Sequence, residues 1–409
     1  MHTNIEDSAV TQVPLKEAVP SHTLAISLLA FTMFVIVTSE FAVVGLLPAM
    51  TKDLDIGLSE AGWFISCFAL GASLFGPLIT QLVARYQGAD FLAAASIVFA
   101  LGNLLIAIVP SYYTVIATRV LQGAMLPAMV SIAALEAVRI AGTGRGGWAI
   151  SRVNLGVAAT TIIGVPFSVI VADKLGWSIS FAGLAMLGLI CAAAITLWFP
   201  VARAKPSSAL PAVSLLWRPG FLLQLLLSCI LFAGMFSSYS YITAVLVTLT
   251  TINGPMLGWS LMGFGVAGVL GNWLCGRVAE RDPLALTAWV SLALAIAMAV
   301  FTTAANSLLA LTLVIGLWGC AHLAAFVTSQ IRVMQAGHDV PAIALALNIS
   351  ACNLGIGIGT TLGGMSVHSY GVEAASYTGA ALVTIAFLLT VFMIRHRLRN
   401  KVVGVVSSQ

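Results

Sequence analysis

Two ionisable side chains stand deep inside long apolar stretches of this sequence, Glu40 and Arg119. Glu40 precedes Pro48, at the end of its stretch, by about 12 Å of helix, and Arg119 lies about 10 Å into a later stretch. An unpaired charge in an apolar interior is costly, so such groups are paired, hydrated or neutralised by a proton. The two residues could therefore move protons, or they could form a fixed ion pair that only joins two helices.

Other candidates are less isolated. His322 could titrate near physiological pH, or it could be a structural histidine. Polar and aromatic residues inside apolar stretches could line a pocket for a small molecule, or could bond and pack between helices; they are Asn154, Tyr239, Tyr241, Trp318, Phe326, Gln330, Asn348 and Asn353. Glu136, Arg139 and Arg152 lie at the ends of their stretches and could form a gate or a solvated surface.

The elements that position these residues are about twelve apolar spans of membrane-crossing length. The chain is 60% hydrophobic and 8% charged, with mean hydropathy +1.05. The spans are apolar on all sides, which predicts helices rather than strands. We place them at 24–48, 60–84, 90–109, 112–139, 147–172, 178–200, 220–248, 256–279, 284–305, 307–333, 341–366 and 374–395.

Basic residues predict the topology of these spans. The sequence has 18 Lys and Arg residues, and 15 of them lie on the same side of the predicted spans as the N-terminus. Lys52 and Lys174 lie in loops on the opposite side, and Arg119 lies within a span. Positive charge concentrates on the cytoplasmic side of membrane proteins, so both termini are expected in the cytoplasm. This distribution accounts for the net charge of +4 without a nucleic-acid partner.

The spans divide into two similar sets. A Pro- and Ser-containing segment at 201–219 separates six spans from six. Gly62 and Trp63 align with Gly258 and Trp259, and the same offset aligns Phe68 with Phe264. We predict an all-α membrane protein with two six-helix bundles at 23–200 and 220–395, a linker at 201–219, and tails at 1–22 and 396–409.

Signatures of enzymes and cofactors are missing from the sequence. It has no Gly-x-x-x-x-Gly-Lys-Ser/Thr loop for nucleotides and no Gly-x-Ser-x-Gly turn. Its six cysteines fall within predicted spans without a Cys-x-x-Cys pair, as expected of packing residues. We therefore predict no catalytic residue, no metal site and no cofactor.

Several motifs resemble the major facilitator superfamily, in particular its twelve-span drug/proton antiporters and the bacterial sugar, nucleoside and chloramphenicol efflux permeases. These motifs are Glu40-Phe41 with Gly45-Leu46-Leu47-Pro48, Arg119-Val120-Leu121-Gln122-Gly123, Gly156 with Gly164-Val165-Pro166, and Asn353-Leu354-Gly355. The fifth-span motif is similar to the one that marks exporters in that family, which implies gating roles for Gly164 and Pro166.

The resemblance implies proton-coupled export of a small organic molecule across the bacterial inner membrane, by a monomer. In the resembled fold the first and fourth spans border one cavity, so Glu40 is the expected proton carrier and Arg119 its modulator. Uncoupled uptake or facilitated diffusion, and a receptor that does not transport, are the alternatives.

One loop departs from the family pattern. Between the second and third spans the family has an acid before an arginine and basic residues after it, whereas this chain has Ala84, Arg85 and no following basic pair. The repeat copy keeps Glu280 beside Arg281. We expect Arg85, Glu280 and Arg281 to contribute to gating, with a weakened latch on the Arg85 side.

Overall fold

A computed structural model describes residues 19–83, 86–142, 145–199, 213–278 and 281–406. Within these residues every regular element is a helix, as predicted. The elements are α1 (Val19–Leu54), α2 (Leu58–Val83), α3 (Gly88–Ile108), α4 (Tyr112–Ala141), α5 (Gly146–Ala159), the π-helix η1 (Thr160–Gly164), α6 (Val165–Leu175), α7 (Trp177–Trp198), α8 (Val213–Leu216), α9 (Pro219–Tyr239), α10 (Ile242–Leu249), α11 (Gly254–Val278), α12 (Pro283–Ala304), α13 (Leu308–Ala336), α14 (Pro341–Tyr370) and α15 (Ala374–Val406).

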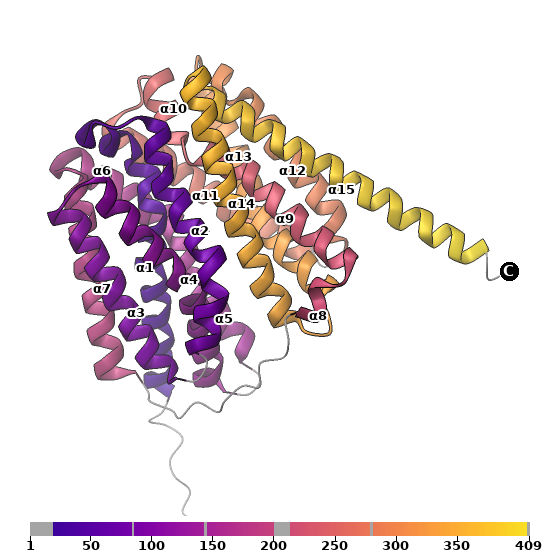
Figure 1. Ribbon diagram of the computed structural model, residues 1–409, viewed down its shortest axis with the longest axis horizontal. Helices are drawn as coiled ribbons and strands as arrows, with labels where there is room; N and C mark the ends of the chain where they lie inside the picture. Colours follow the sequence, from indigo (N-terminus) through magenta and orange to yellow (C-terminus); the bar gives the residue numbers. More distant parts are fainter. Residues whose placement is uncertain (1–18, 84–85, 143–144, 200–212, 279–280, 407–409) are drawn as a thin grey trace, which may run out of the picture.

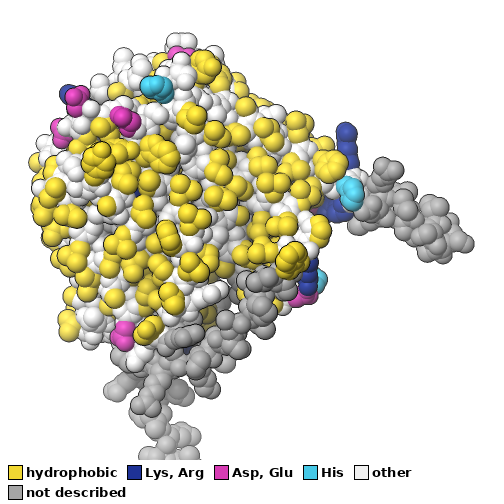
Figure 2. Space-filling model, in the orientation of Figure 1, with side chains coloured by type: hydrophobic (Ala, Val, Ile, Leu, Met, Phe, Trp, Pro, Cys, Tyr) yellow, Lys and Arg dark blue, Asp and Glu magenta, His cyan; other side chains and the backbone are white. Residues whose placement is uncertain are grey.

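Twelve helical segments in the described part of the chain are long and apolar enough to cross a membrane, which confirms the predicted fold class. The first runs from His22 to Leu54 and continues through Pro48, where the prediction ended it. Figure 2 shows apolar side chains over the middle of one face and acidic side chains gathered towards its upper edge. A broad apolar belt of this kind is the surface that a lipid bilayer covers.

The helices form two halves, α1–α7 and α8–α15, which lie side by side (Figure 1). They meet where α2 packs against α14 and where α11 packs against α6 and η1. The predicted linker lies outside the described residues from 201 to 212, as does the predicted N-terminal tail from 1 to 18. The segment predicted as the C-terminal tail begins as a continuation of α15, which ends at Val406.

The internal repeat is visible in backbone packing. A Cβ on Gly123 of α4 would lie 2.0 Å from the Phe68 carbonyl oxygen on α2. In the second half, a Cβ on Gly319 of α13 would lie 2.3 Å from the Phe264 carbonyl oxygen on α11. Both residues of the second pair follow their counterparts by 196 positions, the same offset that aligns the sequence motifs. Small residues at these positions let the helix backbones touch.

A second pair of contacts repeats with a different offset. A Cβ on Gly156 of α5 would lie 1.8 Å from the Ala30 carbonyl oxygen on α1, and one on Gly359 of α14 would lie 2.0 Å from the Ala233 carbonyl oxygen on α9. These counterparts are 203 positions apart. The two halves therefore use the same close helix contacts. The offset between counterparts is seven residues longer for this second set than for the first.

Candidate functional site

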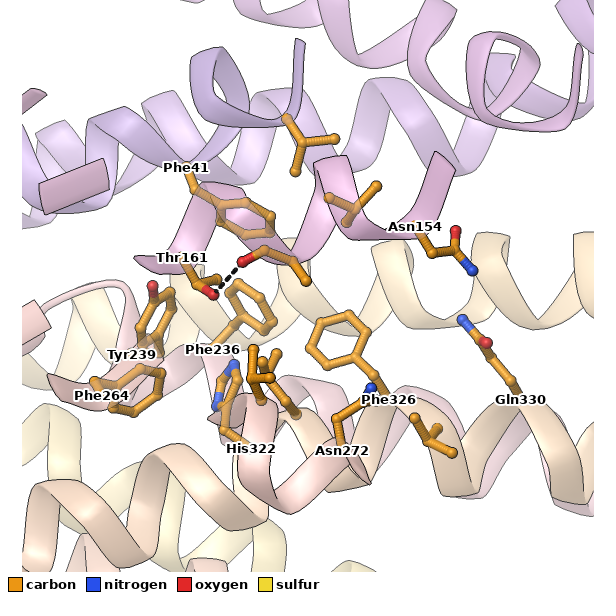
Figure 3. A pocket seen from close by; sticks show the side chains of 16 residues that line it. Phe41, Asn154, Thr161, Phe236, Tyr239, Phe264, Asn272, His322, Phe326 and Gln330 are labelled. Atoms are coloured by element: carbon orange, nitrogen blue, oxygen red, sulfur yellow. Dashed lines mark hydrogen bonds between the residues drawn. The ribbon is translucent and has the colours of Figure 1, made fainter. Parts of the chain in front are cut away.

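The two halves enclose a cavity of about 290 Å³. Its walls come from α1, α5 and η1 on one side and from α9, α11 and α13 on the other (Figure 3). The lining residues are Val37, Phe41, Asn154, Val157, Ala158, Thr161, Phe236, Tyr239, Phe264, Val269, Asn272, His322, Leu323, Phe326, Val327 and Gln330. None of these residues is an acid, a lysine or an arginine, so the lining is apolar with a few uncharged polar groups.

Helical spacing explains why these residues share one space. His322, Phe326 and Gln330 follow each other at intervals of four on α13, and Val37 and Phe41 do so on α1. Residues four apart lie on one face of an α-helix, so each helix presents a single stripe to the cavity. The facing stripes of the two halves form its walls.

Five of the nine residues predicted to line a substrate pocket are in this lining: Asn154, Tyr239, His322, Phe326 and Gln330. Four lie elsewhere. Trp318 is buried outside the lining, against the rings of Phe264 and Phe301 at centroid distances of 5.9 and 5.0 Å.

Tyr241, Asn348 and Asn353 make hydrogen bonds to other residues of the second half and do not line the cavity. The Tyr241 hydroxyl donates to the Thr360 carbonyl oxygen over 3.0 Å. The Asn348 amide donates to the Ser329 hydroxyl over 3.4 Å, and the Asn353 amide donates to the Ile349 carbonyl oxygen of its own helix over 3.0 Å.

The sequence prediction missed Phe41, Thr161, Phe236, Phe264 and Asn272 as lining residues. Asn272 carried a usable signal, because an amide within an apolar span needs a polar partner or a wet cavity. The phenylalanines carried none, because phenylalanine is frequent in these spans and its ring is as suited to packing as to lining a pocket.

His322 lies within a ring of aromatic side chains. Its imidazole centroid is 4.8 Å from that of Tyr239, 5.4 Å from Phe264, 5.5 Å from Phe236 and 5.9 Å from Phe326. Its Nδ1 is buried and has no hydrogen-bond partner among the described residues. Unpaired buried polar atoms are costly, so this nitrogen is available to a water molecule or a ligand.

Glu40 lies beside the cavity wall on α1. It follows the lining residue Val37 by three positions and directly precedes Phe41. Its side chain is half-buried and within electrostatic range of Arg119. Among the described residues, however, its carboxylate is in no ion pair and no hydrogen bond. The arrangement differs from a fixed Glu40–Arg119 ion pair.

Arg119 is fully buried and bonds to the backbone next to Glu40. Its Nη1 donates to the Ser39 carbonyl oxygen over 2.7 Å. Its guanidinium lies 5.3 Å from the Phe181 ring centroid and 5.9 Å from that of Phe68, within cation–π range. Its Nε and Nη2 are buried without hydrogen-bond partners in the described part of the chain. The arginine therefore retains free donors in this state.

A polar network supports the Arg119 contact. The Ser39 hydroxyl donates to Asn103 Oδ1 over 2.8 Å, and the Gln122 amide donates to the same oxygen over 3.0 Å. Gln122 belongs to the Arg-x-x-Gln-Gly motif, so the motif joins α4 to α1 through α3. This network fixes the segment of α1 that carries Glu40.

The halves interlock at the end of the cavity near the α1–α2 connection. The Thr243 hydroxyl of α10 donates to the Val44 carbonyl oxygen of α1 over 2.7 Å. The Thr361 hydroxyl of α14 donates to the Ser66 hydroxyl of α2 over 3.1 Å. We call this interlocked region the seal; it comprises Val44, Gly62, Ser66, Tyr241, Thr243, Thr360, Thr361 and Gly364. At the other end, the Asn154 and Gln330 amides face each other across the cavity (Figure 3).

The exporter-like motif forms an irregular turn in its helix. The Val165 N–H donates to the Thr160 carbonyl oxygen, a π-helical bond, just before Pro166. Proline has no N–H to donate, which favours such a change of hydrogen-bond pattern. A Cβ on Gly164 would lie 2.1 Å from the Thr38 hydroxyl oxygen of α1. Gly164 therefore permits close approach of this turn to α1.

The remaining predicted gating residues lie near the opposite end. Arg139 Nε donates to Glu136 Oε2 over 2.7 Å within α4, and the Arg152 guanidinium lies 5.4 Å from the Trp148 ring centroid within α5. Arg281 is exposed in a turn before α12. Arg85 and Glu280 lie outside the described residues, so the structure does not place the loop motif.

Comparison with known proteins identifies the family. The Major Facilitator Superfamily profile matches residues 29–341. The chain belongs to the Major Facilitator Superfamily. It is 31% identical over 372 residues to the inner membrane transport protein YdhP of Escherichia coli K12, an alignment that covers 89% of this chain and 94% of YdhP.

Solved structures show the same fold. The nucleoside transporter NupG superposes with a TM-score of 0.76 at 14% identity, covering 91% of this chain and 99% of NupG. A bacterial homologue of the human lysosomal transporter Spinster, in an inward-facing and occupied conformation, gives 0.75 at 14% identity, covering 92% of this chain and 97% of that one. The chain is thus a multi-pass membrane protein of a family that transports small molecules.

Proposed function

We propose that this major facilitator exports a small organic molecule from the cytoplasm in exchange for protons, by alternating access in the bacterial inner membrane. The observation that carries the proposal is the placement of Glu40. It is a half-buried carboxylate without a direct partner among the described residues, and it stands beside a cavity that both halves enclose.

Alternating access is supported by the interlocked seal at one end and the facing amides at the other. On the predicted topology the seal is periplasmic, so the cavity is reached from the cytoplasm in this state. Rocking of the halves about the cavity would open the seal and close the opposite end. The repeated glycine contacts join helices within each half, which favours movement of each half as a unit.

Proton coupling is supported by the relation between Glu40 and Arg119. In this state the arginine bonds to the Ser39 carbonyl oxygen and keeps two donor nitrogens free. A small shift of α1 along α4 would change how strongly the guanidinium favours the charged carboxylate. Substrate binding that moves α1 would thereby release the Glu40 proton, and protonation would release the substrate.

The direction of transport is supported by the fifth-span motif, in which Gly164 and Pro166 form the irregular turn against α1. Because the lining has no charged residue, the proposed substrate is uncharged. The partners that this mechanism needs are a small-molecule substrate, protons and the lipid bilayer. One chain supplies the whole lining of the cavity, so we propose that the protein works as a monomer.

The test is substrate-induced proton release from the purified protein in weakly buffered detergent solution. A panel of uncharged sugars, nucleosides and aromatic compounds is added to the wild type, to Glu40→Gln and to Glu60→Gln. Glu60 is the control acid, because it lies in the first turn of α2, where it accepts the Gly57 N–H. Release by at least one compound is expected in the wild type and in Glu60→Gln.

Loss of that release in Glu40→Gln supports the proposal, and its persistence overturns Glu40 as the carrier. Binding without release in the wild type indicates an uncoupled facilitator, whose flux in proteoliposomes would ignore a pH gradient. Binding with neither release nor flux indicates a receptor on the same fold.

A further inference from the structure

The cavity has two chemically different ends. Figure 3 shows Tyr239, Phe264, Phe236 and His322 towards one end, and the amides of Asn154 and Gln330 at the other. His322 and Gln330 are eight residues apart on one face of α13, which separates their Cα atoms by about 12 Å. One small molecule of that length can touch both ends.

The aromatic end presents rings from both halves. Phe41 of α1 stacks on Phe236 of α9 with centroids 6.0 Å apart and ring planes inclined at 28°. The Phe326 ring meets Phe232 edge-on at 4.6 Å and also lines the cavity. Aromatic rings attract a further flat ring in stacked or edge-on geometry more strongly than they attract a saturated ring of equal size.

Four uncharged polar groups of the cavity have no hydrogen-bond partner among the described residues, whereas the Thr161 hydroxyl donates to the Ala158 carbonyl oxygen. The side chains of Asn154, Asn272 and Gln330, and the Tyr239 hydroxyl, make no hydrogen bond within the described part of the chain. Amides and hydroxyls can donate and accept, so they match hydroxyl or amide groups of a ligand. A charged ligand would lose its hydration here without meeting an opposite charge in the lining, which is costly.

Resting on the proposed transport function, we propose that the cavity binds an uncharged molecule with one flat aromatic ring and a portion rich in hydroxyl or amide groups. The ring packs against the cavity-facing side of the cluster formed by Phe41, Phe236, His322 and Phe326. The polar portion lies between Asn154 and Gln330, and His322 Nδ1 or the Tyr239 hydroxyl bonds to a polar substituent near the ring.

Matched probes separate these requirements. Calorimetric binding to the purified protein at pH 7.5 is measured for phenyl β-D-glucoside, its saturated counterpart cyclohexyl β-D-glucoside, and the anionic 4-carboxyphenyl β-D-glucoside, with adenosine as an aryl probe of different shape. At least one neutral aryl probe is expected to bind. Phenyl glucoside is expected to bind about tenfold more tightly than cyclohexyl glucoside. The anion is expected to bind at least tenfold more weakly than phenyl.

Variants assign the preference to the cavity. Phe326→Leu is expected to reduce the phenyl-over-cyclohexyl ratio to about twofold. Phe392→Leu, an exposed phenylalanine on α15, is the control and is expected to keep the wild-type ratio. Gln330→Ala is expected to lower the affinities for phenyl glucoside and cyclohexyl glucoside by the same factor, because it removes a contact with the sugar that the two probes share.

No binding of either neutral aryl probe at millimolar concentration, equal affinity for phenyl and cyclohexyl, or tighter binding of the anion would each overturn the inference about the ligand. Its failure is distinguishable from failure of the transport proposal. Proton release caused by a non-aromatic polyol would refute the aromatic ligand and leave the antiport proposal standing. Binding of an aryl probe without proton release would refute antiport and leave the aromatic ligand standing.

Discussion

Gly62 of α2 and Tyr241 at the α9–α10 break fit together so closely that a Cβ on Gly62 would lie 2.0 Å from the Tyr241 hydroxyl oxygen. Gly364 of α14 flanks the same hydroxyl, since its Cβ would lie 2.5 Å away. The tyrosine of one half is thus inserted between a glycine of the other half and a glycine of its own. The fit brings α2, α14 and the α9–α10 break together in the seal, and a side chain on Gly62 would oppose it.

Gly62→Ala is expected to open the seal, because alanine and the Tyr241 ring compete for one space. The measurement is the labelling rate of Val44→Cys by a membrane-impermeant maleimide added from the side of the seal. Val44 is fully buried there, and the parent chain gives the background from the native cysteines. We expect about a tenfold faster rate, the equivalent of about 1.4 kcal/mol.

Gly263→Ala is the matched control, since a Cβ at Gly263 of α11 would meet nothing within 4 Å. Adding Tyr241→Phe to Gly62→Ala removes the nearest oxygen and leaves Cζ at 3.0 Å, so partial recovery of the slow rate is expected. Unchanged labelling in Gly62→Ala would mean that the fit does not control the seal.

A double-mutant cycle decides how Glu40 and Arg119 are coupled in this state. Arg119→Gln is expected to lower the free energy of unfolding by about 1–3 kcal/mol, because it removes the donor to a buried carbonyl oxygen. Since no ion pair joins the two side chains, the coupling energy with Glu40→Gln is expected to be below about 1 kcal/mol. Chemical unfolding in one detergent measures all four proteins. A coupling of about 3 kcal/mol or more would instead indicate a fixed buried pair.

The sequence predicted the spans because apolar length is a local property of the chain. It could not predict which side of each span faces the cavity, because helices that are apolar all round have no polar face to orient them. Tyr239 and Tyr241 illustrate the limit. Both were expected to bind substrate, but the helix breaks between α9 and α10, and Tyr239 lines the cavity whereas Tyr241 enters the seal.

The proximity of Glu40 and Arg119 could be predicted from the sequence, whereas their role in proton coupling stays a proposal. The depths of Glu40 and Arg119 placed them at one level, and the structure brings them within electrostatic range. Their actual link, through the Ser39 carbonyl oxygen, was not predictable, because the sequence does not show how far a guanidinium is from a carboxylate or from the adjacent backbone. Asn272 gave the signal of an amide in an apolar span, but that signal does not distinguish a residue that faces the cavity from one that bonds to a neighbouring helix.

The repeated glycine contacts predict matched losses of stability. Gly156→Ala and Gly359→Ala place a methyl group 1.8 and 2.0 Å from a backbone oxygen of the neighbouring helix, so the helices must separate. Overpacking of this kind costs about 1–3 kcal/mol. Thermal unfolding in detergent should show both variants melting below the wild type. Gly183→Ala, in open space on α7, should melt at or slightly above it, and equal behaviour of all three would contradict the packing argument.

The ion pair between Asp282 and Arg397 joins the start of α12 to the C-terminal part of α15. Arg397 Nη2 donates to Asp282 Oδ2 over 2.6 Å, and Nη1 donates to Oδ1 over 3.3 Å. Asp282 also caps α12, since its Oδ1 accepts the Ala285 N–H over 3.2 Å. The hydrogen bond from Arg397 is the main reason why the pKa of the Asp282 carboxyl lies below its usual value.

Because this pKa is lower in the folded state, the pair stabilises the fold above the ordinary pKa of aspartate. The contribution is lost as pH falls through the folded-state pKa. Asp282→Asn keeps a side-chain oxygen for the cap but removes the charge. At pH 7 the variant should be less stable by under about 1 kcal/mol, because both side chains are partly exposed. Unfolding measured between pH 7 and pH 3 should show the difference shrinking at the acid end. A gap that stays constant, or widens on acidification, would assign it to the cap or to packing rather than to the charge.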